Sequence, residues 1–388
     1  MFGNKKTYLS LMAGLLLSLF ALYFTFKNIP FGELVDYLKR VNYWWAIPSM
    51  ALAVMSFLIR VVRWQLLLAP VRRTGFASAY HPLMIGFMAN CLLPARAGEL
   101  ARPAIFSKRE HVPFTKVLAT VGVERALDVV VLILSFVIVF ASVEISSSLH
   151  FTLAGYHLDK ATLQMSGMTT LRLLLGLVLA IALVSLRKTR TVMKRVVLSL
   201  PNLLFFVSKS LREMMRERFC TRLVRIIDNL AAGFELLKSP KKLGLCLVLS
   251  VLVWAVAGAS YYVMAFGCPG IQLSFFQMYA VLVILCFFIS LPSAPGFWGL
   301  WEAGGVFGLL IFGIPAGEAA GFTLANHVFQ MVPVIVLGLV SLTIIGVTMV
   351  RTALEVEAEG GGLQESARTK PAYTNETDEV CREYIKDA

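Results

Sequence analysis

A charged segment bounded by prolines, residues 92–103, interrupts a chain that otherwise consists of long apolar runs. Pro94 lacks a backbone donor and disfavours a helical residue before it, and Gly98 permits a sharp turn. The charged residues that follow Pro94 are Arg96, Glu99 and Arg102. Such irregular backbone lies at membrane depth only where protein or a water-filled cavity surrounds it. The segment therefore predicts a broken, re-entrant helix beside a cavity.

A second interruption lies in residues 291–302 and repeats the Leu-Pro-x-x-x-Gly spacing of the first. Its helix-breaking residues are Pro292, Pro295 and Gly296. Two broken helices in corresponding halves of a membrane protein indicate the binding site of a transporter. Because this short spacing also recurs by chance in apolar sequence, the orientation of the flanking spans carries more of the argument.

The composition excludes a soluble globular protein. Hydrophobic residues make up 58% of the chain and charged residues 15%, whereas soluble domains average about 45–50% and about 25%. A length of 388 residues leaves room for roughly eight spans of about 20 residues with their loops. We therefore predict an all-α polytopic membrane protein with about 6–8 transmembrane helices. The net charge of +13 comes from basic residues between apolar runs, a pattern that argues against nucleic-acid binding.

Apolar runs mark the predicted transmembrane spans. They cover residues 8–26, 43–68, 117–143, 171–186, 243–266 and 322–350. Two further apolar segments, residues 76–93 and 275–291, lead into the breaks, and residues 31–40 predict an amphipathic interfacial helix. The first run is too long for the apolar part of a signal peptide, so we read it as a retained span.

The distribution of cations sets the predicted orientation. Residues 187–225 hold eleven Lys and Arg against two Glu, which places the loop of residues 187–240 in the cytoplasm by the positive-inside rule. Residues 1–351 then form the transmembrane domain, residues 352–388 a disordered tail, and both termini are cytoplasmic in an inner membrane. The spans before the two breaks run in opposite directions, which predicts an inverted-topology repeat.

Charged and polar residues near the breaks are the candidate substrate-binding residues. A charge at the bilayer centre costs about 2.5–3.5 kcal/mol on insertion scales, so a cluster of charges needs a reason. We interpret the cluster as a polar cavity in which an arginine binds the phosphate of a lipid headgroup, while carboxylates fix the arginines and meet any headgroup ammonium. Structural ion pairs at the membrane edge are the alternative. The candidates are Arg63, Asn90, Arg96, Glu99, Arg102, Glu124, Arg125, Asp128 and Glu302.

Some of these residues, and other polar residues of the predicted spans, have simpler interpretations. Arg60 and Arg63, in the last turns of the second span, are expected to snorkel toward the cytoplasmic surface. Glu302, beside two tryptophans, is either the counterpart acid of the second half or an interfacial residue. Asn326 and His327 are expected to form a polar helix-packing pair.

Motifs of hydrolytic and nucleotide-driven chemistry are absent from the sequence, including GxSxG, HExxH and the Walker loop. The six cysteines and five histidines show no metal-ligand spacing, so we expect neither a metal nor a cofactor. A lipid translocase is the favoured function, and a transporter is favoured over an enzyme. The alternatives are a lipid-modifying transferase with Glu99 or Asp128 as base, and a scaffold acting through the basic loop. That loop is also expected to attract anionic lipid headgroups, and a homodimer is an open alternative.

Four motifs carry a resemblance to a known family. They are Arg63-Trp64-x-x-Leu67-Leu68, Gly86-x-x-x-Asn90-x-x-x-Pro94-Ala95-Arg96-x-Gly98-Glu99-x-x-Arg102, Glu124-Arg125-x-x-Asp128 and Leu291-Pro292-x-x-Pro295-Gly296-x-x-Gly299. With them the chain resembles the lysylphosphatidylglycerol synthase transmembrane family, also called the flippase-like domain family. The resemblance implies a lipid translocase built on re-entrant segments, moving a phospholipid or a polyprenyl-linked lipid. The soluble aminoacyl-transferase domain of larger members has no counterpart here, so we expect no lysyl-lipid synthesis.

Overall fold

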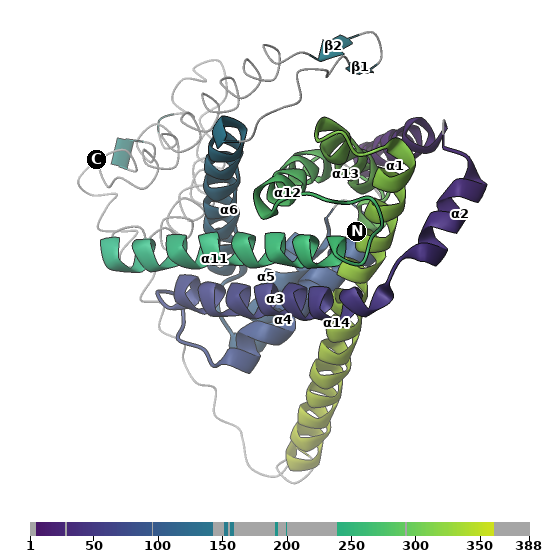
Figure 1. Cartoon of the computed structure of the whole chain (residues 1–388). Coiled ribbons are helices and arrows are strands. Elements are labelled where there is room, and N and C mark those ends of the chain that lie inside the picture. Colours follow the sequence, from purple (N-terminus) through teal and green to yellow (C-terminus); the bar gives the residue numbers. More distant parts are fainter. Residues whose placement is uncertain are drawn as a thin grey trace, which may run out of the picture. The chain divides into compact units, whose positions relative to one another are not determined.

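Figure 1 shows the computed structural model of the chain. It describes residues 5–27, 29–94, 96–142, 151–153, 156–158, 191–192, 199, 239–291 and 293–360. The chain divides into a unit of residues Met1–Leu342 and a unit of residues Thr343–Ala388. All packing described below lies within the first unit.

The described part of the chain is almost entirely helical, which confirms the predicted all-α class. Its N-terminal half holds α1 (Lys5–Phe26), α2 (Phe31–Arg40), η1 (Tyr43–Trp45), α3 (Ala46–Leu68), α4 (Phe76–Leu92), α5 (Gly98–Glu110) and α6 (Phe114–Ser142). The C-terminal half holds α11 (Pro240–Ala265), α12 (Phe275–Ile289), η4 (Pro295–Phe297), α13 (Leu300–Ile311) and α14 (Ala316–Gly360). A small antiparallel hairpin, β1 (Phe151–Leu153) with β2 (Tyr156–Leu158), lies in the predicted loop between spans.

Three described helices are long and apolar enough to cross a membrane: Tyr43–Leu68, Pro240–Ala265 and Ala316–Gly346. A fourth span is present if the pair α1 and α2, bent by 83°, is counted as one. Apolar side chains on the outer faces, such as Val248 and Val336, are more than half exposed. Such faces suit lipid as the surrounding solvent, so the chain is a multi-pass membrane protein. The predicted span of residues 171–186 lies outside the described residues.

The two halves repeat one order of elements: a long helix, a shorter helix, a break, a shorter helix and a long helix. The first copy is α3 to α6 and the second is α11 to α14. The leading helices α3 and α11 lie side by side (Figure 1). Ser49, near the start of α3, exchanges hydrogen bonds of 2.9 and 2.8 Å with Ser260, near the end of α11. The leading helices are therefore antiparallel, as an inverted-topology repeat requires.

At both breaks the chain turns back on itself. Glycines then allow the helices on either side of each break to pack closely. In the first hairpin, a Cβ atom added at Gly98 of α5 would collide with the carbonyl oxygen of Gly86 in α4. In the second hairpin, Gly304 and Gly308 of α13 pack against α12, where an added Cβ would lie 3.0 Å from Leu285 Cα and 3.2 Å from Val281 Cα. Thus the second break, like the first, is a hairpin.

The predicted tail and the predicted basic loop lie largely outside the described part of the chain. Helix α14 continues to Gly360, nine residues into the predicted tail, because residues 352–360 include the strong helix formers Ala, Leu and Glu. The rest of the tail, residues 361–388, lies outside the described residues. Nearly all of the basic loop of residues 187–240 also lies outside the described residues, and so does Pro292.

Candidate functional site

The two hairpin breaks meet, although about 200 positions of sequence separate them. Arg96, in the left-handed conformation at φ 52°, donates a hydrogen bond from Nη2 to the carbonyl oxygen of Ile289 at the end of α12. The Arg96 guanidinium also lies 5.7 Å from the ring centre of Phe297. On the same side, a Cβ added at Gly296 would lie 3.2 Å from the carbonyl oxygen of Cys91. The first break therefore contacts both ends of the second.

The first break depends on glycine at position 98. Beyond the collision with Gly86, a Cβ added at Gly98 would lie 2.6 Å from Asn90 Oδ1. Any side chain at residue 98 must therefore push α4 and α5 apart. The close contact of α4 and α5 therefore sets where the chain turns, and with it the positions of Arg96 and Glu99, two residues before and one residue after Gly98.

We expect Gly98→Ala to lower the melting temperature of the purified protein, because overpacking typically costs about 1–3 kcal/mol. Gly122→Ala is the matched control, since residue 122 is also helical and nothing lies within 4 Å of an added Cβ there. The control should be neutral or slightly stabilising, because alanine favours helix over glycine. Equal melting temperatures for the two variants would show that the close contact of α4 and α5 is dispensable.

The second break is fixed by a buried pair, Glu302 and His327. Glu302 Oε1 lies 2.6 Å from His327 Nδ1, and Glu302 Oε2 accepts a hydrogen bond of 2.6 Å from the backbone N–H of Gly299. The other ring nitrogen, His327 Nε2, lies 2.9 Å from the carbonyl oxygen of Gly296 and so must donate to it. The Trp301 ring stacks on the imidazole at 4.3 Å. The pair thus ties α14 to both ends of the turn between η4 and α13.

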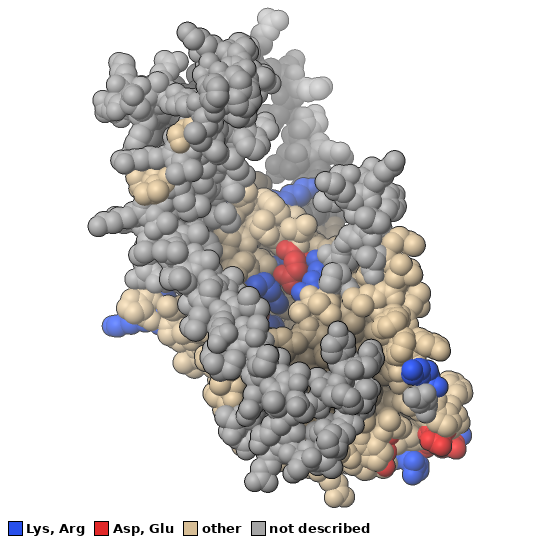
Figure 2. All heavy atoms as spheres, turned by 90° about the horizontal axis from the view of Figure 1, so that it is seen from above, with Lys and Arg blue, Asp and Glu red and all other residues tan. Residues whose placement is uncertain are grey.

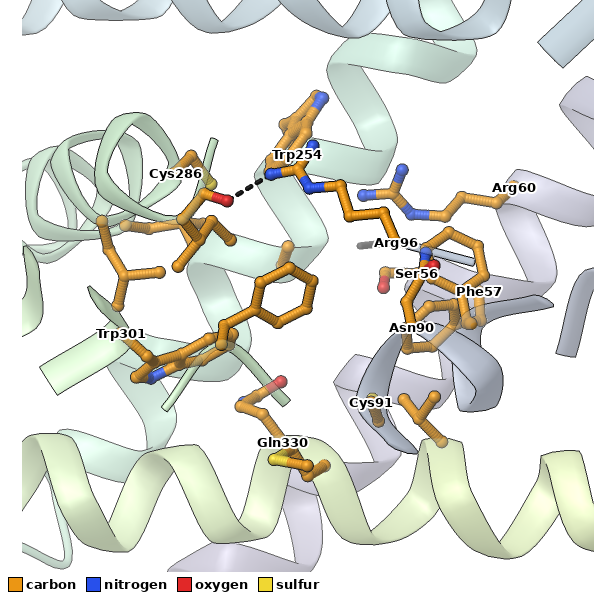
Figure 3. A pocket seen from close by; sticks show the side chains of 18 of the residues that line it. Ser56, Phe57, Arg60, Asn90, Cys91, Arg96, Trp254, Cys286, Trp301 and Gln330 are labelled. Carbon is orange, nitrogen blue, oxygen red and sulfur yellow. Dashed lines mark hydrogen bonds between the residues drawn. The ribbon is translucent and has the colours of Figure 1, made fainter. Parts of the chain in front are cut away.

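A partly open cavity of about 220 Å³ lies between the two hairpins. Its polar and charged lining comes from both halves and includes Ser56, Arg60, Asn90, Arg96, Glu99, Arg125 and Gln330. Its aromatic lining includes Phe57, Phe87, Trp254, Tyr261, Phe297 and Trp301. Figure 3 shows the Arg96 side chain extending across the cavity, with Arg60 beside it and Trp301 on another wall. Figure 2 shows cations and acids together in a hollow of one face.

Behind one wall of this cavity lies a dense network of ion pairs. Arg63 Nη1 lies 2.6 Å from Asp128 Oδ1, and Arg63 Nη2 lies 3.1 Å from Glu124 Oε1. Arg102 pairs with the other oxygen of Glu124, and Trp254 Nε1 donates to Asp128 Oδ1 at 3.2 Å. Every charged side chain in this network is at most 5% exposed. Hence these charges balance one another inside the protein.

The candidate binding residues therefore fall into two sets. Asn90, Arg96, Glu99 and Arg125 line the cavity, so the predicted cavity joining the two breaks is present, and their role in binding stays a prediction. Four others are enclosed in the ion-pair network and do not line it: Arg63, Arg102, Glu124 and Asp128. Glu302 is also enclosed. Enclosed residues can influence a substrate only through the residues they position.

The expectation that Arg60 and Arg63 snorkel is wrong. Arg60 is 7% exposed and Arg63 is fully buried, because carboxylates of α6 lie within reach of both. The Arg60 guanidinium lies 5.0 Å from the ring centre of Trp254 and 3.5 Å from Asp128 Oδ2. The spacing carried a usable signal: residues 60 and 63 share one helix face, as do the acids at 124 and 128.

Asn326 and His327 were predicted to be a polar pair that packs helices together, and the structure shows such a contact between helices for His327. The imidazole of His327 bonds to Glu302 and Gly296, whereas Asn326 Oδ1 accepts a hydrogen bond of 3.4 Å from Gln330. The adjacent residues point in different directions because successive residues on a helix are about 100° apart.

A comparison with protein families gave a match. A family profile described as "Lysylphosphatidylglycerol synthase TM region" matches residues 11–338 of the 388. The match includes both hairpins, the cavity and the ion-pair network. Among curated proteins and among solved structures, no protein matched the chain.

Proposed function

The chain belongs to the lysylphosphatidylglycerol synthase transmembrane family, and from this premise we propose that it moves a lipid between the two leaflets of its membrane. Membership makes the chain a multi-pass membrane protein with a lipid-related function. Translocation is the finer step that we add.

The observation that carries the proposal is the cavity between the two hairpins. Its wall combines charged residues from the first break with aromatic residues from the second, Phe297 and Trp301. At about 220 Å³ it is smaller than the roughly 300–1,000 Å³ of sites that enclose a drug-sized ligand whole. A headgroup fits such a space while the acyl chains stay in the surrounding lipid, where they need no protein cover.

The repeat provides a route across the membrane. Two antiparallel halves, each with a broken hairpin, are typical of transporters whose site opens alternately to either side. Here the contact between Arg96 and the end of α12 lies where the halves would have to separate. The headgroup would pass between the breaks as this contact opens.

A transport assay tests the proposal. The full-length protein is reconstituted into vesicles that contain a fluorescent phospholipid, and a membrane-impermeant reductant then quenches the outer leaflet. The expected result is that lipid of the inner leaflet becomes accessible faster than in protein-free vesicles, with or without an imposed ion gradient. If vesicles with and without the protein gave equal rates, both with and without the ion gradient, translocation would be contradicted.

Among the rival functions, the transferase loses one of its two candidate bases. Asp128 is 3% exposed and is held by Arg63 and Trp254, so it cannot touch a substrate, whereas Glu99 lines the cavity. A scaffold acting through the basic loop stays a rival, as that loop is largely outside the described residues. We keep the inner membrane, cytoplasmic termini, headgroup binding at the basic loop and a homodimer as proposals.

A further inference from the structure

The formal charges of the residues at the cavity do not sum to zero. The cavity wall and the ion-pair network together hold five arginines, at residues 60, 63, 96, 102 and 125, against three carboxylates, at residues 99, 124 and 128. The difference is a formal charge of +2 among these described residues. Unbalanced charge is costly at membrane depth, so an occupant that carries negative charge would be favoured there.

The carboxylates are already engaged by arginines. Glu124 and Asp128 are enclosed by Arg63, Arg102 and Arg125. Glu99 is the acid that the described residues contribute to the cavity lining, and its Oε2 lies 3.6 Å from Arg125 Nε. An ammonium group in the cavity would have to compete with Arg125 for Glu99.

Hydrogen-bond donors without a partner also favour an occupant rich in acceptor oxygens. Two N–H groups of cavity-lining residues, Arg60 Nε and Trp301 Nε1, are buried without a hydrogen-bond partner in the described structure, whereas Arg125 Nε lies 3.6 Å from Glu99 Oε2. A buried donor without an acceptor costs about 1–3 kcal/mol, more when it is charged. Arg60 and Trp301 lie on different walls of the cavity (Figure 3), and each donor needs a group with acceptor oxygens. A phosphate group has that chemistry.

Of these two residues, Arg60 is the one whose side chain is charged and can therefore attract a phosphate. Arg60 is 7% exposed, and its guanidinium lies 5.0 Å from the ring centre of Trp254 and 5.7 Å from that of Phe87, with Nη1 3.5 Å from Asp128 Oδ2. Contacts with aromatic faces hold a guanidinium in place without using its hydrogen-bond donors. Figure 3 shows Arg60 beside Arg96 at the cavity.

We infer that the cavity selects a lipid whose headgroup is a phosphate with net negative charge and no ammonium group, and that Arg60 determines this specificity. The inference rests on the proposed function for the lipid source of the phosphate. It deepens that function by naming the substrate class.

The test compares two fluorescent lipids, phosphatidylglycerol and phosphatidylcholine, in the reconstituted transport assay. The wild-type protein is expected to move phosphatidylglycerol faster. Arg60→Gln should slow phosphatidylglycerol about tenfold, the effect of losing one charge-assisted hydrogen bond. Arg72→Gln is the matched control, because Arg72 is exposed and pairs with Glu110 away from the cavity. Equal rates for the two lipids in the wild type would overturn the inference, even if Arg60→Gln fails to fold.

A binding measurement separates this inference from the proposed function. The melting temperature of the full-length protein is measured in phosphatidylcholine nanodiscs, alone, with added phosphatidylglycerol and with added inorganic phosphate. Stabilisation by phosphatidylglycerol that Arg60→Gln removes would support the inference even if no lipid is transported. Equal stabilisation by inorganic phosphate would assign the site to a free anion and overturn the lipid class. No stabilisation by either would overturn the inference altogether.

Discussion

Replacing Arg63 with methionine is expected to prevent the protein from accumulating in folded form. Arg63 is fully buried, and its guanidinium pairs with both Glu124 and Asp128. Removing one partner of a buried ion pair leaves an uncompensated charge and costs about 3–5 kcal/mol, a large share of the 5–15 kcal/mol, roughly, that stabilises a typical domain. The measurement is the melting temperature and the yield of monodisperse protein after detergent extraction.

The matched control for this variant is Arg72→Met. Arg72 also pairs with a carboxylate, at 3.0 Å from Glu110, but its side chain is 53% exposed. An exposed pair contributes about 0–1 kcal/mol, so the control should behave almost like the wild type. If Arg63→Met were as stable as Arg72→Met, the ion-pair network would not hold α3 to α6.

Replacing Arg96 or Glu99 with alanine is expected to slow lipid transport strongly while leaving the protein folded. Both side chains line the cavity, and neither is enclosed in the ion-pair network. Removing Arg96 takes away its contact with Ile289 and a donor for a phosphate, whereas removing Glu99 takes away one of the three carboxylates that pair with Arg125. Each change removes a charged hydrogen-bonding group, so we expect the transport rate to fall by a factor of about ten or more.

The readout for these variants is the fluorescent-lipid assay, with the melting temperature as the check on folding. Lys39→Ala serves as the control, because Lys39 is exposed on α2 and pairs with Asp36. Transport at the wild-type rate by folded Arg96→Ala and Glu99→Ala proteins would remove both residues from the mechanism.

The helices were predictable because apolar runs and prolines are local signals. Residues 31–40 were predicted as one amphipathic helix, and α2 has the same bounds. The repeat was predictable for a related reason, since the placement of cations orients the spans. By contrast, the start of α14 at Ala316 was predicted six residues late, because Gly317 and Gly321 weaken the helical signal there.

The candidate site was only partly predictable, because sequence spacing does not say which helix faces meet. Glu124 and Arg125 are neighbours in α6, yet Glu124 is enclosed in the network and Arg125 lines the cavity. The contact between Glu302 and His327 joins residues 25 positions apart, on different helices, and no local pattern indicates it. Arg60 was missed because a cation near the end of a span is usually at the membrane surface.

The central claim is that headgroups pass through the cavity between the two breaks. Cys91 tests it directly, because this free cysteine lines the cavity next to the first break. Cys286 also lines the cavity, so the measurement uses Cys286→Ala protein, labelled with a bulky thiol reagent and assayed for transport of fluorescent phosphatidylglycerol. The Cys91→Ala/Cys286→Ala protein, treated identically, controls for labelling elsewhere. The account predicts that labelling stops transport in the first protein and leaves it unchanged in the second. Full transport by protein shown by mass spectrometry to be labelled at Cys91 would contradict it.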